Sequence, residues 1–458
     1  MSQRDRDSEP VNEWMDAEGR VERAHDLYED GRWAEAAAEL EAAIAVNPYN
    51  ASWHFNLGLT LEALEEYPLA CKAYRDALEL APHDIEALNC LGVNLTRLGQ
   101  YAEGLGCFRR IEELDATYEA AYCNRIVTYA EMGQHDDAEV MFYLAQQLKA
   151  DCPLCFYNIG NSLYARRLYG RAIYCWKKTL RLDANHPQAN VRIAEAYWAQ
   201  GELAEARKHY EAELRLSPAD ADVLVDYGEL LDDLGCPRQA EEKYRRALEL
   251  VPEHPSAHFC LGELALVRGQ PAVAEEHFRR VLKADKHFPG IHIRLAQTMI
   301  RRGRVQQAAK HIVKELRQSG DDPGTLQELG QLLLEAHLIR QANGVLRRLV
   351  HLAPTDPCAQ HNLAVSFFRM HRIDEGIRHC RKALKLKPEY PLALYNLALA
   401  HLQKGQVLRA RRYVARAMTI APDDEHVRRL SERLGAQGFW RRLRSRLSAG
   451  RGGRKIGD

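Results

Sequence analysis

Apolar and polar positions recur along the chain with a period of 34 residues. Beginning at Ala17, the same pattern returns twelve times, without insertion or deletion, and ends at Asp424. Each copy holds two stretches in which apolar residues repeat with helical spacing, separated by a short polar turn. In the second copy these stretches cover residues 51–64 and 69–80. In seven copies a proline follows the second stretch, as expected where a helix ends. The pattern therefore predicts twelve pairs of helices.

Two positions of this repeat are almost always small. The twentieth residue is Ala or Gly in all twelve copies, and the eighth is Ala or Gly in eleven, with Ile126 as the exception. Small side chains let two antiparallel helices approach closely, so both positions are predicted to lie at the contact within each pair. Aromatic residues stand at position 24 of seven copies and are predicted to fill the space towards the next copy. Ile126 in repeat 4, and Ile312 and Leu346 at position 24 of repeats 9 and 10, predict a bend or looser packing there, with ordinary repeat drift as the alternative.

The repeat resembles the tetratricopeptide repeat, and the match covers residues 17–424. The residues that carry the resemblance in the second copy are Leu57, Gly58, Tyr67, Ala70, Tyr74, Ala77 and Pro82. The resemblance implies an all-α, right-handed superhelical solenoid of antiparallel helix hairpins, with a concave groove lined by the first helices. It also implies a general role in binding proteins or peptides.

The repeat boundaries divide the chain into four predicted parts. Residues 1–16 form a disordered or partly helical N-terminal segment, of which the polar residues 1–11 are predicted to be disordered. Residues 17–424 hold the twelve repeats, and residues 425–435 form a C-terminal cap helix, which a solenoid needs. Residues 436–458 form a basic amphipathic or disordered tail.

Charge is distributed unevenly although the total is close to zero, at -1. Residues 357–458 hold 22 Lys and Arg against 8 Asp and Glu, whereas residues 1–356 hold 41 against 56. The balanced total argues against a protein that coats nucleic acid. The chain has no run of about 18 apolar residues and no apolar signal segment at its start, so we expect a cytoplasmic protein with reduced thiols, peripheral at a membrane if the tail binds one.

Repeat 7 carries an acidic stripe on its first helix. In the family, positions 2, 5, 6, 9, 12 and 13 of the first helix face the groove. Five carboxylates occupy such positions in repeat 7: Asp222, Asp226, Glu229, Asp232 and Asp233. Carboxylates on one helical stripe repel one another, so the stripe predicts a site for a basic peptide, with a solvated acidic face as the alternative. Arg294 and Arg301 stand at equivalent positions in repeat 9, so a groove ligand could be held by opposite charges at its two ends.

Asparagine recurs on the same predicted face. The asparagines at positions 6 and 9 are Asn56, Asn124, Asn158, Asn161, Asn362 and Asn396. An amide both donates and accepts hydrogen bonds, so it can hold an extended peptide backbone without reading its sequence. This arrangement resembles the asparagine ladder in the repeat domain of O-linked N-acetylglucosamine transferases. It makes Asn124 and Asn158 the strongest candidates for contacts with a peptide backbone.

Cys152 and Cys155 form one Cys-x-x-Cys pair, and a structural zinc site usually needs two such pairs. We therefore interpret these cysteines as small buried residues and predict no metal. The alternative is a metal or redox role with Cys123 and Cys175 as further ligands. The repeats contain none of the sequence motifs of nucleotide-binding loops, hydrolases or zinc proteases, so the sequence predicts no enzyme and no cofactor.

The basic tail is the second candidate binding segment. Its candidate contacts with an anionic membrane are Trp440, Arg441, Arg442, Arg444 and Arg446. Tryptophan beside several arginines is typical of segments that lie on anionic lipid surfaces. The alternatives are contacts with nucleic acid phosphates, which the overall charge disfavours, and a solvated tail without a partner.

The sequence as a whole predicts a non-enzymatic scaffold or adaptor that binds peptide or protein segments in its groove. Two alternatives remain open: a membrane-peripheral assembly factor anchored by the tail, and a regulatory repeat subunit of a separate enzyme such as a glycosyltransferase. The partner and the oligomeric state are not specified by the sequence.

Overall fold

The computed structural model of the protein describes residues 9–318 and 320–435. Every regular element within these residues is an α-helix. Contacts between Cα atoms divide the chain into two compact units, residues 1–240 and 241–458, with the division inside one helix. We call these unit 1 and unit 2.

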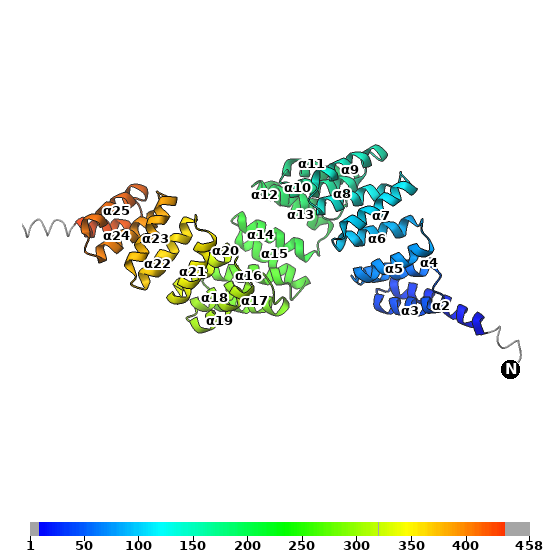
Figure 1. Ribbon diagram of the computed structural model, residues 1–458, viewed down its shortest axis with the longest axis horizontal. Coiled ribbons are helices and arrows are strands. Elements are labelled where there is room, and N and C mark those ends of the chain that lie inside the picture. The colour runs from blue at the N-terminus through cyan, green and yellow to red at the C-terminus, as the bar shows by residue number, and fades with distance from the viewer. Residues whose placement is uncertain (1–8, 319, 436–458) are drawn as a thin grey trace, which may run out of the picture. The chain divides into compact units, whose positions relative to one another are not determined.

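The helices follow one another in pairs, one pair to each repeat (Figure 1). The pairs up to the division are α2 (Glu9–Glu29) with α3 (Trp33–Val46), α4 (Ala51–Ala63) with α5 (Tyr67–Leu80), α6 (Ile85–Arg97) with α7 (Tyr101–Leu114), α8 (Glu119–Glu131) with α9 (His135–Leu148), α10 (Pro153–Ala165) with α11 (Tyr169–Leu182), α12 (Ala189–Ala199) with α13 (Leu203–Leu216), and α14 (Ala221–Asp233) with α15 (Pro237–Leu250), the helix that contains the division. The pairs of unit 2 are α16 (Pro255–Val267) with α17 (Pro271–Ala284), α18 (Ile291–Arg301) with α19 (Val305–Gln318), α20 (Pro323–Glu335) with α21 (Ile339–Leu352), α22 (Pro357–Arg369) with α23 (Ile373–Leu386), and α24 (Pro391–Gln403) with α25 (Val407–Ile420).

The predicted all-α repeat fold is confirmed, and several helix ends differ from the prediction. Helix α5 begins at Tyr67 rather than at residue 69, with Pro68 inside its first turn, where proline is tolerated because the first amides have no helical partner. Helix α2 begins at Glu9, so residues 9–11 are helical where disorder was predicted. Helices α12 and α18 begin two residues later than the pattern predicts. Their N-caps, Gln188 and Gly290, have left-handed backbone with φ of 63° and 71°.

The close contact inside each hairpin joins position 8 of the first helix to position 24 of the second. Glycine faces an aromatic ring in four hairpins: Gly58 with Tyr74, Gly92 with Phe108, Gly160 with Trp176 and Gly262 with Phe278. A Cβ atom added at Gly92 would lie 2.6 Å from the Phe108 ring. The aromatic residues therefore pack on their own hairpin first, which the sequence did not predict. They also reach the next repeat, since Tyr74 shares a buried cluster with Leu91 and Leu95.

Repeat 4 differs from these hairpins because Ile126, a larger residue, occupies position 8. Phe142, the aromatic residue at position 24 of the same hairpin, is 8% exposed to solvent, whereas Phe108 and Trp176 are 0% exposed. Phe142 instead packs edge-on against Phe156 of repeat 5, with ring centroids 5.2 Å apart. Ile126 and Phe142 nevertheless both remain buried, in one cluster.

The turn between the two helices has one constant feature, a left-handed residue at position 15. This residue has positive φ in all twelve repeats, and it is glycine in eight of them. In the other four it is Glu65, Arg167, His337 or His371, with φ between 59° and 62°. Side chains other than glycine are strained in this region. The turn conformation is therefore a requirement of the hairpin and does not depend on glycine alone.

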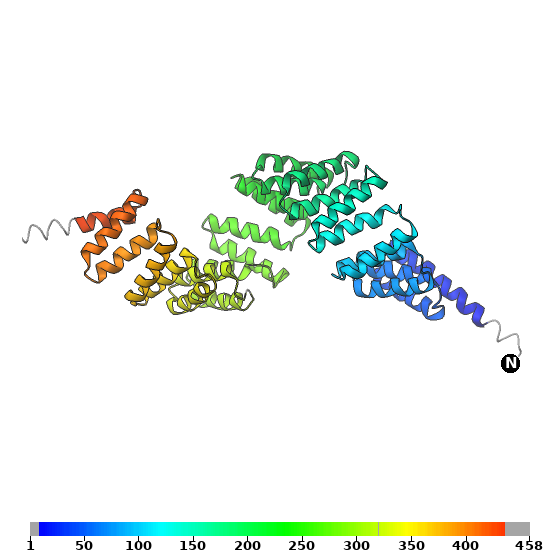
Figure 2. The ribbon, with the colours of Figure 1, turned by 45° about the horizontal axis from the view of Figure 1, so that its top comes forward.

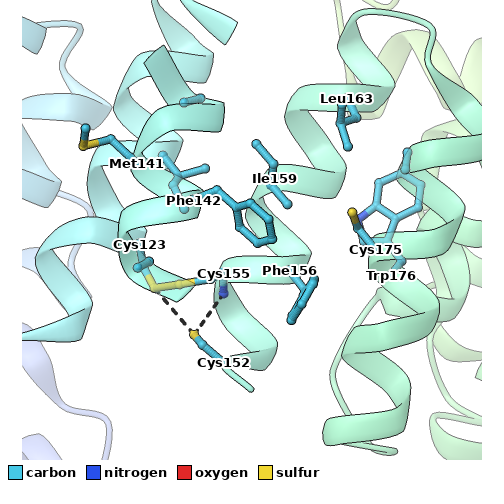
Figure 3. Packing of buried hydrophobic residues seen from close by; sticks show 14 of the residues in the cluster. Cys123, Met141, Phe142, Cys152, Cys155, Phe156, Ile159, Leu163, Cys175 and Trp176 are labelled. Atoms are coloured by element: carbon cyan, nitrogen blue, oxygen red, sulfur yellow. Dashed lines mark hydrogen bonds between the residues drawn. A yellow bond between two sulfur atoms is a disulfide. The ribbon is translucent and has the colours of Figure 1, made fainter. Parts of the chain in front are cut away.

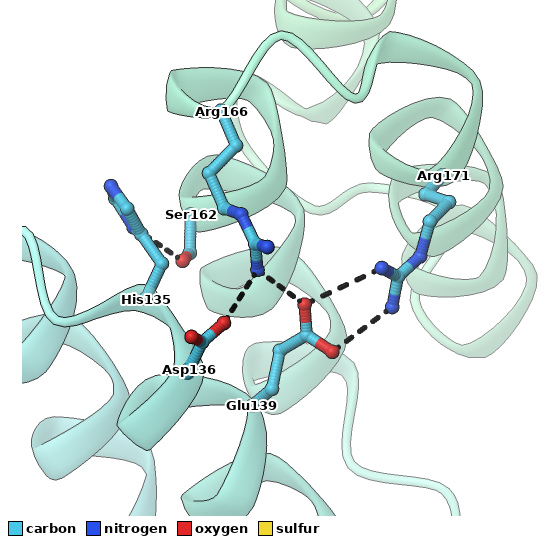
Figure 4. Close-up of polar contacts among 6 residues, drawn as sticks. All are labelled: His135, Asp136, Glu139, Ser162, Arg166 and Arg171. Atoms are coloured by element: carbon cyan, nitrogen blue, oxygen red, sulfur yellow. Dashed lines mark hydrogen bonds and ion pairs between the residues drawn. The ribbon is translucent and has the colours of Figure 1, made fainter.

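Polar contacts join neighbouring repeats at their edges (Figure 4). Glu139 of α9 accepts hydrogen bonds from Arg166, which caps α10, at 2.8 Å and from Arg171 of α11 at 3.1 Å. Nearby, His135 Nδ1 lies 2.9 Å from the Ser162 hydroxyl. One side chain of repeat 4 therefore holds both helices of repeat 5. Because the arginines are partly exposed, such pairs orient the repeats more than they stabilise them.

Unit 2 shows the same order of hairpins from α16 to α25, coloured green to orange in Figure 2. Residues 425–435 are helical and follow the last pair. Val427, Leu430 and Leu434 are buried there in a cluster with Leu394 and Val414. The apolar face of repeat 12 is therefore covered by this helix.

Four hairpins carry a buried polar pair that the sequence analysis missed. It joins position 4 of the first helix to a histidine at position 23 of the second. The pairs are Asn190 with His209 at 3.0 Å, His258 with His277 at 3.0 Å, His292 with His311 at 3.0 Å and Gln360 with His379 at 2.9 Å. Burial is the main cause that lowers the pKa of every histidine in these pairs, to about 4 for His209 and His292. A 34-residue spacing of histidine was the signal that could have found them.

The contact at position 8 predicts opposite effects for two glycine substitutions within repeat 3. Gly92→Ala should destabilise the protein by about 1–3 kcal/mol, because the new methyl group overlaps the Phe108 ring. Gly106→Ala should stabilise by up to about 1 kcal/mol, because Gly106 is an exposed residue of α7 with open space around it and alanine favours helix. Urea unfolding followed by circular dichroism measures both, and a shift in the same direction would contradict this packing.

The buried histidines predict that acid destabilises the fold. Their pKa values are lower in the folded than in the unfolded chain, so the unfolded state binds more protons and stability falls as pH drops from about 6.5 towards 4. The melting temperature should therefore be lower at about pH 5 than at about pH 7.5. His292→Gln should reduce this difference, since His292 is fully buried, whereas His287→Gln, at an exposed histidine, should leave it unchanged. Equal effects of the two variants would argue against the buried pairs as the cause.

Candidate functional site

The first helices of successive repeats lie side by side, and asparagines at position 6 connect them. Asn124 Nδ2 of α8 donates a hydrogen bond to Asn89 Oδ1 of α6 at 2.8 Å. Asn158 Nδ2 of α10 donates to the Cys123 carbonyl of α8 at 3.4 Å. Both amides thus use a donor to hold the preceding repeat. Their predicted role in holding a peptide would have to rely on the remaining atoms of the amide.

The other predicted asparagines have different surroundings. Asn396 Nδ2 lies 2.8 Å from His361 Nε2, and Asn362 forms a hydrogen bond with the same histidine. Asn56 lines a pocket between α2 and α4. Asn161 of α10 has a buried Oδ1 that no donor reaches among the described residues. Among these asparagines Asn161 therefore has a carbonyl oxygen without a donor, although that atom is buried.

The acidic stripe lies on α14. Its five members are placed as predicted by helical spacing, with Asp222, Glu229 and Asp233 exposed and Asp226 and Asp232 half-buried. Two carboxylates come from outside the stripe, since Glu195 of α12 and Asp220, the N-cap of α14, also act on Asp226. The sequence analysis did not include Glu195, although it stands at position 9 of repeat 6, one of the positions expected to face the groove.

Asp226 is the carboxylate most perturbed by these neighbours. Burial, followed by the charges of Glu229, Glu195 and Asp222, raises the pKa of Asp226 to about 7. Its ionised form is therefore costly in the folded protein at neutral pH. Close by, burial and then the charge of Asp226 raise the pKa of the Tyr210 hydroxyl.

Several polar groups of this surface are buried or already have a partner, which limits the atoms that a ligand could contact. Tyr210 is fully buried, and its hydroxyl has no hydrogen-bond partner among the described residues. Asp233, by contrast, accepts a hydrogen bond from the Trp198 indole at 2.7 Å. Arg192 pairs with Glu195 at 2.9 Å, so one guanidinium already lies on this surface. Asp226 is therefore a better candidate for contact with a ligand than Asp233.

The two predicted arginines lie in unit 2 and have partners there. Arg294 forms ion pairs with Glu263 at 3.0 Å and Glu328 at 2.7 Å. Arg301 donates to the Leu266 carbonyl of the preceding repeat at 2.8 Å. These contacts hold α16, α18 and α20 in register, and a ligand would have to displace them. The predicted tail contacts Trp440, Arg441, Arg442, Arg444 and Arg446 lie outside the described residues.

A second cluster of functional side chains lies between α8 and α10 (Figure 3). Cys123 and Cys155 form a disulfide, and Cys152 Sγ lies 3.7 Å from Cys123 Sγ. The Cys155 amide donates a hydrogen bond to Cys152 Sγ at 3.1 Å. Of the two further cysteines named from the sequence, Cys123 joins the pair, whereas Cys175 lies on α11 beside Trp176 and is not part of the cluster.

Glu119 completes this cluster, and the sequence analysis missed it. It stands one helical turn before Cys123 on the same face of α8, a spacing that could have identified it. Lys149 Nζ lies 2.9 Å from its carboxylate. Burial opposes ionisation of Glu119, but hydrogen bonds from Cys152 and Lys149 outweigh it and lower the pKa of Glu119. Burial and the Glu119 carboxylate raise the pKa of Cys152 to about 11.

The geometry defines an α-helical repeat protein whose unit is a 34-residue hairpin with a small residue at position 8 and a left-handed turn at position 15. Sequence models of the tetratricopeptide repeat match residues 21–85, 157–221, 227–314 and 367–434. The chain therefore belongs to the tetratricopeptide repeat family.

Individual relatives are distant. The chain is 24% identical over 155 residues to the TPR repeat-containing protein YpiA of Bacillus subtilis, a match that covers 33% of this chain and 36% of YpiA. It is 23% identical over 223 residues to the peroxisomal targeting signal receptor of Saccharomyces cerevisiae, covering 46% of this chain and 36% of the receptor. The chain spans about a third of the length of these relatives. In the crystal structure of the APC/C hetero-tetramer of Cut9 and Hcn1, a chain of 14% identity aligns with a TM-score of 0.44, over 90% of this chain and 95% of that one.

None of the helices in the described part of the chain combines the length and the apolar character needed to cross a membrane.

The environment of Asp226 predicts a stabilising substitution. Because its pKa is raised to about 7, the folded protein carries the full cost of its charge above that pH and less of it as pH falls towards the unfolded value of about 4. Asp226→Asn should therefore raise the melting temperature at about pH 8 and have a smaller effect at about pH 5. A lower melting temperature at pH 8 would show that the carboxylate makes net stabilising contacts.

Proposed function

We propose that the protein is a non-enzymatic interaction scaffold, and that the first helices of repeats 6 and 7 bind a basic peptide segment of a partner protein. The observation that carries this proposal is the surface formed by α12 and α14, where Glu195, Asp222 and Glu229 act on the half-buried carboxylate of Asp226. We call this surface the acidic patch. A carboxylate whose ionised form is unfavourable in the folded chain is typical of functional sites.

A lysine or arginine side chain would relieve this cost. It would neutralise part of the charge and supply hydrogen bonds that are strengthened by the charge of both partners. The pair of Arg192 with Glu195 at 2.9 Å supports this, because it shows that a guanidinium fits against the acidic patch.

The backbone of the peptide would be held on the neighbouring first helices. Asn161 Oδ1 is the atom best suited for this, since no donor reaches it among the described residues. It can accept a hydrogen bond from a peptide amide whatever the side chain, while the acidic patch selects for basic residues. A receptor for a peroxisomal targeting signal is, by its name, among the relatives of the chain, which supports recognition of a protein segment.

Binding of a basic peptide should depend on pH through Asp226. The affinity for a labelled peptide of alternating Arg and Gly should fall as pH drops through about 7, because Asp226 then takes up a proton in the free protein. Asp226→Asn should weaken binding by about tenfold at pH 8, the loss of one charge-assisted hydrogen bond, and should flatten the pH dependence. Fluorescence anisotropy with the full chain measures both.

The matched control is Glu79→Gln, which removes the same charge from an exposed position on α5, outside the acidic patch. It should leave the affinity unchanged. Equal weakening by the two variants would show that the peptide responds only to net charge, and unchanged binding by Asp226→Asn would rule out the acidic patch as the site.

A further inference from the structure

Four potential metal ligands from two neighbouring first helices meet between repeats 4 and 5. Glu119 and Cys123 lie one turn apart on α8, Cys152 is the N-cap of α10, and Cys155 lies in the first turn of α10. The three sulfur atoms and a carboxylate oxygen all lie within 4.8 Å of one another. The chain thus supplies four ligand atoms of the kinds that zinc binds, within reach of one centre.

The spacing of the sulfur atoms agrees with tetrahedral coordination. With Zn–S bonds of about 2.3 Å, a tetrahedral site separates two sulfurs by about 3.8 Å. Cys123 Sγ and Cys152 Sγ are 3.7 Å apart. The Cα atoms of Cys123 and Cys155 are 5.3 Å apart, so little backbone movement is needed for both sulfurs to reach one ion. Cys152 and Cys155 also have the two-residue separation that is common among zinc ligands.

The surroundings of the cluster are suited to a charged metal–thiolate centre. Cys123, Cys152 and Cys155 are buried, with at most 3% of their surface exposed, whereas the Glu119 side chain is 26% exposed. Three thiolates and one carboxylate around Zn²⁺ carry a net charge of -2. Lys149, 2.9 Å from Glu119, offsets part of it, as does the amide of Cys155 that donates to the Cys152 sulfur.

Cys152 also departs from the repeat in an informative way. Its position, the last of each repeat, caps the following first helix with an aspartate or asparagine side chain in five repeats. Cys152, the last residue of repeat 4, holds the corresponding position, and its sulfur caps α10, the first helix of repeat 5. A sulfur in the capping position is fixed in direction by the first turn of the helix, as a metal ligand needs to be.

We propose that, once its disulfide is reduced, the protein binds one Zn²⁺ through Cys123, Cys152, Cys155 and the carboxylate of Glu119. Reduction of the Cys123–Cys155 bond takes two electrons and two protons from a dithiol reductant, which itself becomes a disulfide. Zn²⁺ then replaces the protons of the three thiols, and these protons pass to solvent. The metal site and the disulfide are alternative crosslinks between α8 and α10, and the redox state of the compartment selects one of them.

The proposal does not depend on the acidic patch, which lies on α12 and α14. It gives repeats 4 and 5 a crosslink at the place where Ile126 replaces the usual small residue. Ile126, Phe142 and the three cysteines belong to the same buried cluster. Metal binding should therefore stabilise the contact between repeats 4 and 5.

The test uses the full chain, reduced and kept without oxygen, and titrated with Co²⁺ and Zn²⁺. Tetrahedral Co²⁺ absorbs visible light, and the intensity of its sulfur-to-cobalt charge-transfer absorption rises with each thiolate ligand, so the spectrum counts sulfur ligands without any substitution. We expect one Co²⁺ with three thiolates, displaced by an equal amount of Zn²⁺. The oxidised protein should bind neither ion, because its disulfide removes two ligands.

Substitutions then assign the ligands. Cys152→Ser and Cys155→Ser should each weaken Zn²⁺ binding by more than about 100-fold, beyond the loss usual for a group that only supports a ligand. Glu119→Gln should weaken Zn²⁺ binding by a smaller factor and leave the charge-transfer intensity of three thiolates. Cys175→Ser is the matched control, because Cys175 is buried but is not one of the four proposed ligands, and this variant should bind Zn²⁺ like the original chain.

Three results would overturn the proposal. These are a Co²⁺ spectrum with fewer than three thiolates, equal weakening by Cys175→Ser, and metal binding that is the same in the oxidised protein. Because the first and third use the unsubstituted chain, the proposal can fail even where a cysteine variant does not fold.

Discussion

The contact between a small residue at position 8 and the side chain at position 24 is the constraint on which the other features of each hairpin depend. Where position 8 is glycine, an aromatic ring can lie directly on the first helix, as Phe278 lies on Gly262. Where it is alanine, the facing residue is mostly smaller, as with Ala364 and Cys380, which share one buried cluster. The hairpin thus conserves the volume at this contact more than the identity of either residue. The contact also fixes the rotation of the first helix, and therefore which of its positions remain for binding.

This constraint explains why the sequence predicted so much of the fold. A 34-residue period with small residues at positions 8 and 20 implies two helices in contact, and the structure places a helix pair in each repeat. What the period could not predict are departures that depend on backbone conformation. Helix α12 begins late because Gln188 has left-handed backbone, and glutamine gives no sign of this in the sequence. Helix α2 extends back to Glu9 although the residues there are polar.

The candidate sites were predicted less completely, because they combine residues from two repeats. Helical spacing puts Asp226 on one stripe of α14 with Asp222 and Glu229, but its pKa also depends on Glu195 of the preceding first helix. The asparagine pattern was visible, yet the donor of Asn124 is used by Asn89, one repeat earlier. A pattern along the chain shows which side chains face the same way. It does not show which of them already have a partner in the neighbouring helix.

The cysteine cluster lies between repeat 5 and repeat 4, whose residue at position 8 differs from that of every other repeat. In a protein built from repeats, each hairpin contacts mainly its neighbours, so a weak contact is not offset by the rest of the chain. Repeat 4 has Ile126 in place of a small residue at position 8, and its Phe142 is 8% exposed. The same repeat has an ion pair to the preceding repeat, between the buried Arg125 and the partly exposed Glu112 at 2.6 Å, and the crosslinked sulfurs between α8 and α10. A crosslink there, whether a disulfide or a metal ion, joins α8 to α10 in the same buried cluster that holds Ile126. This is the physical reason to regard the cysteines as more than small buried residues.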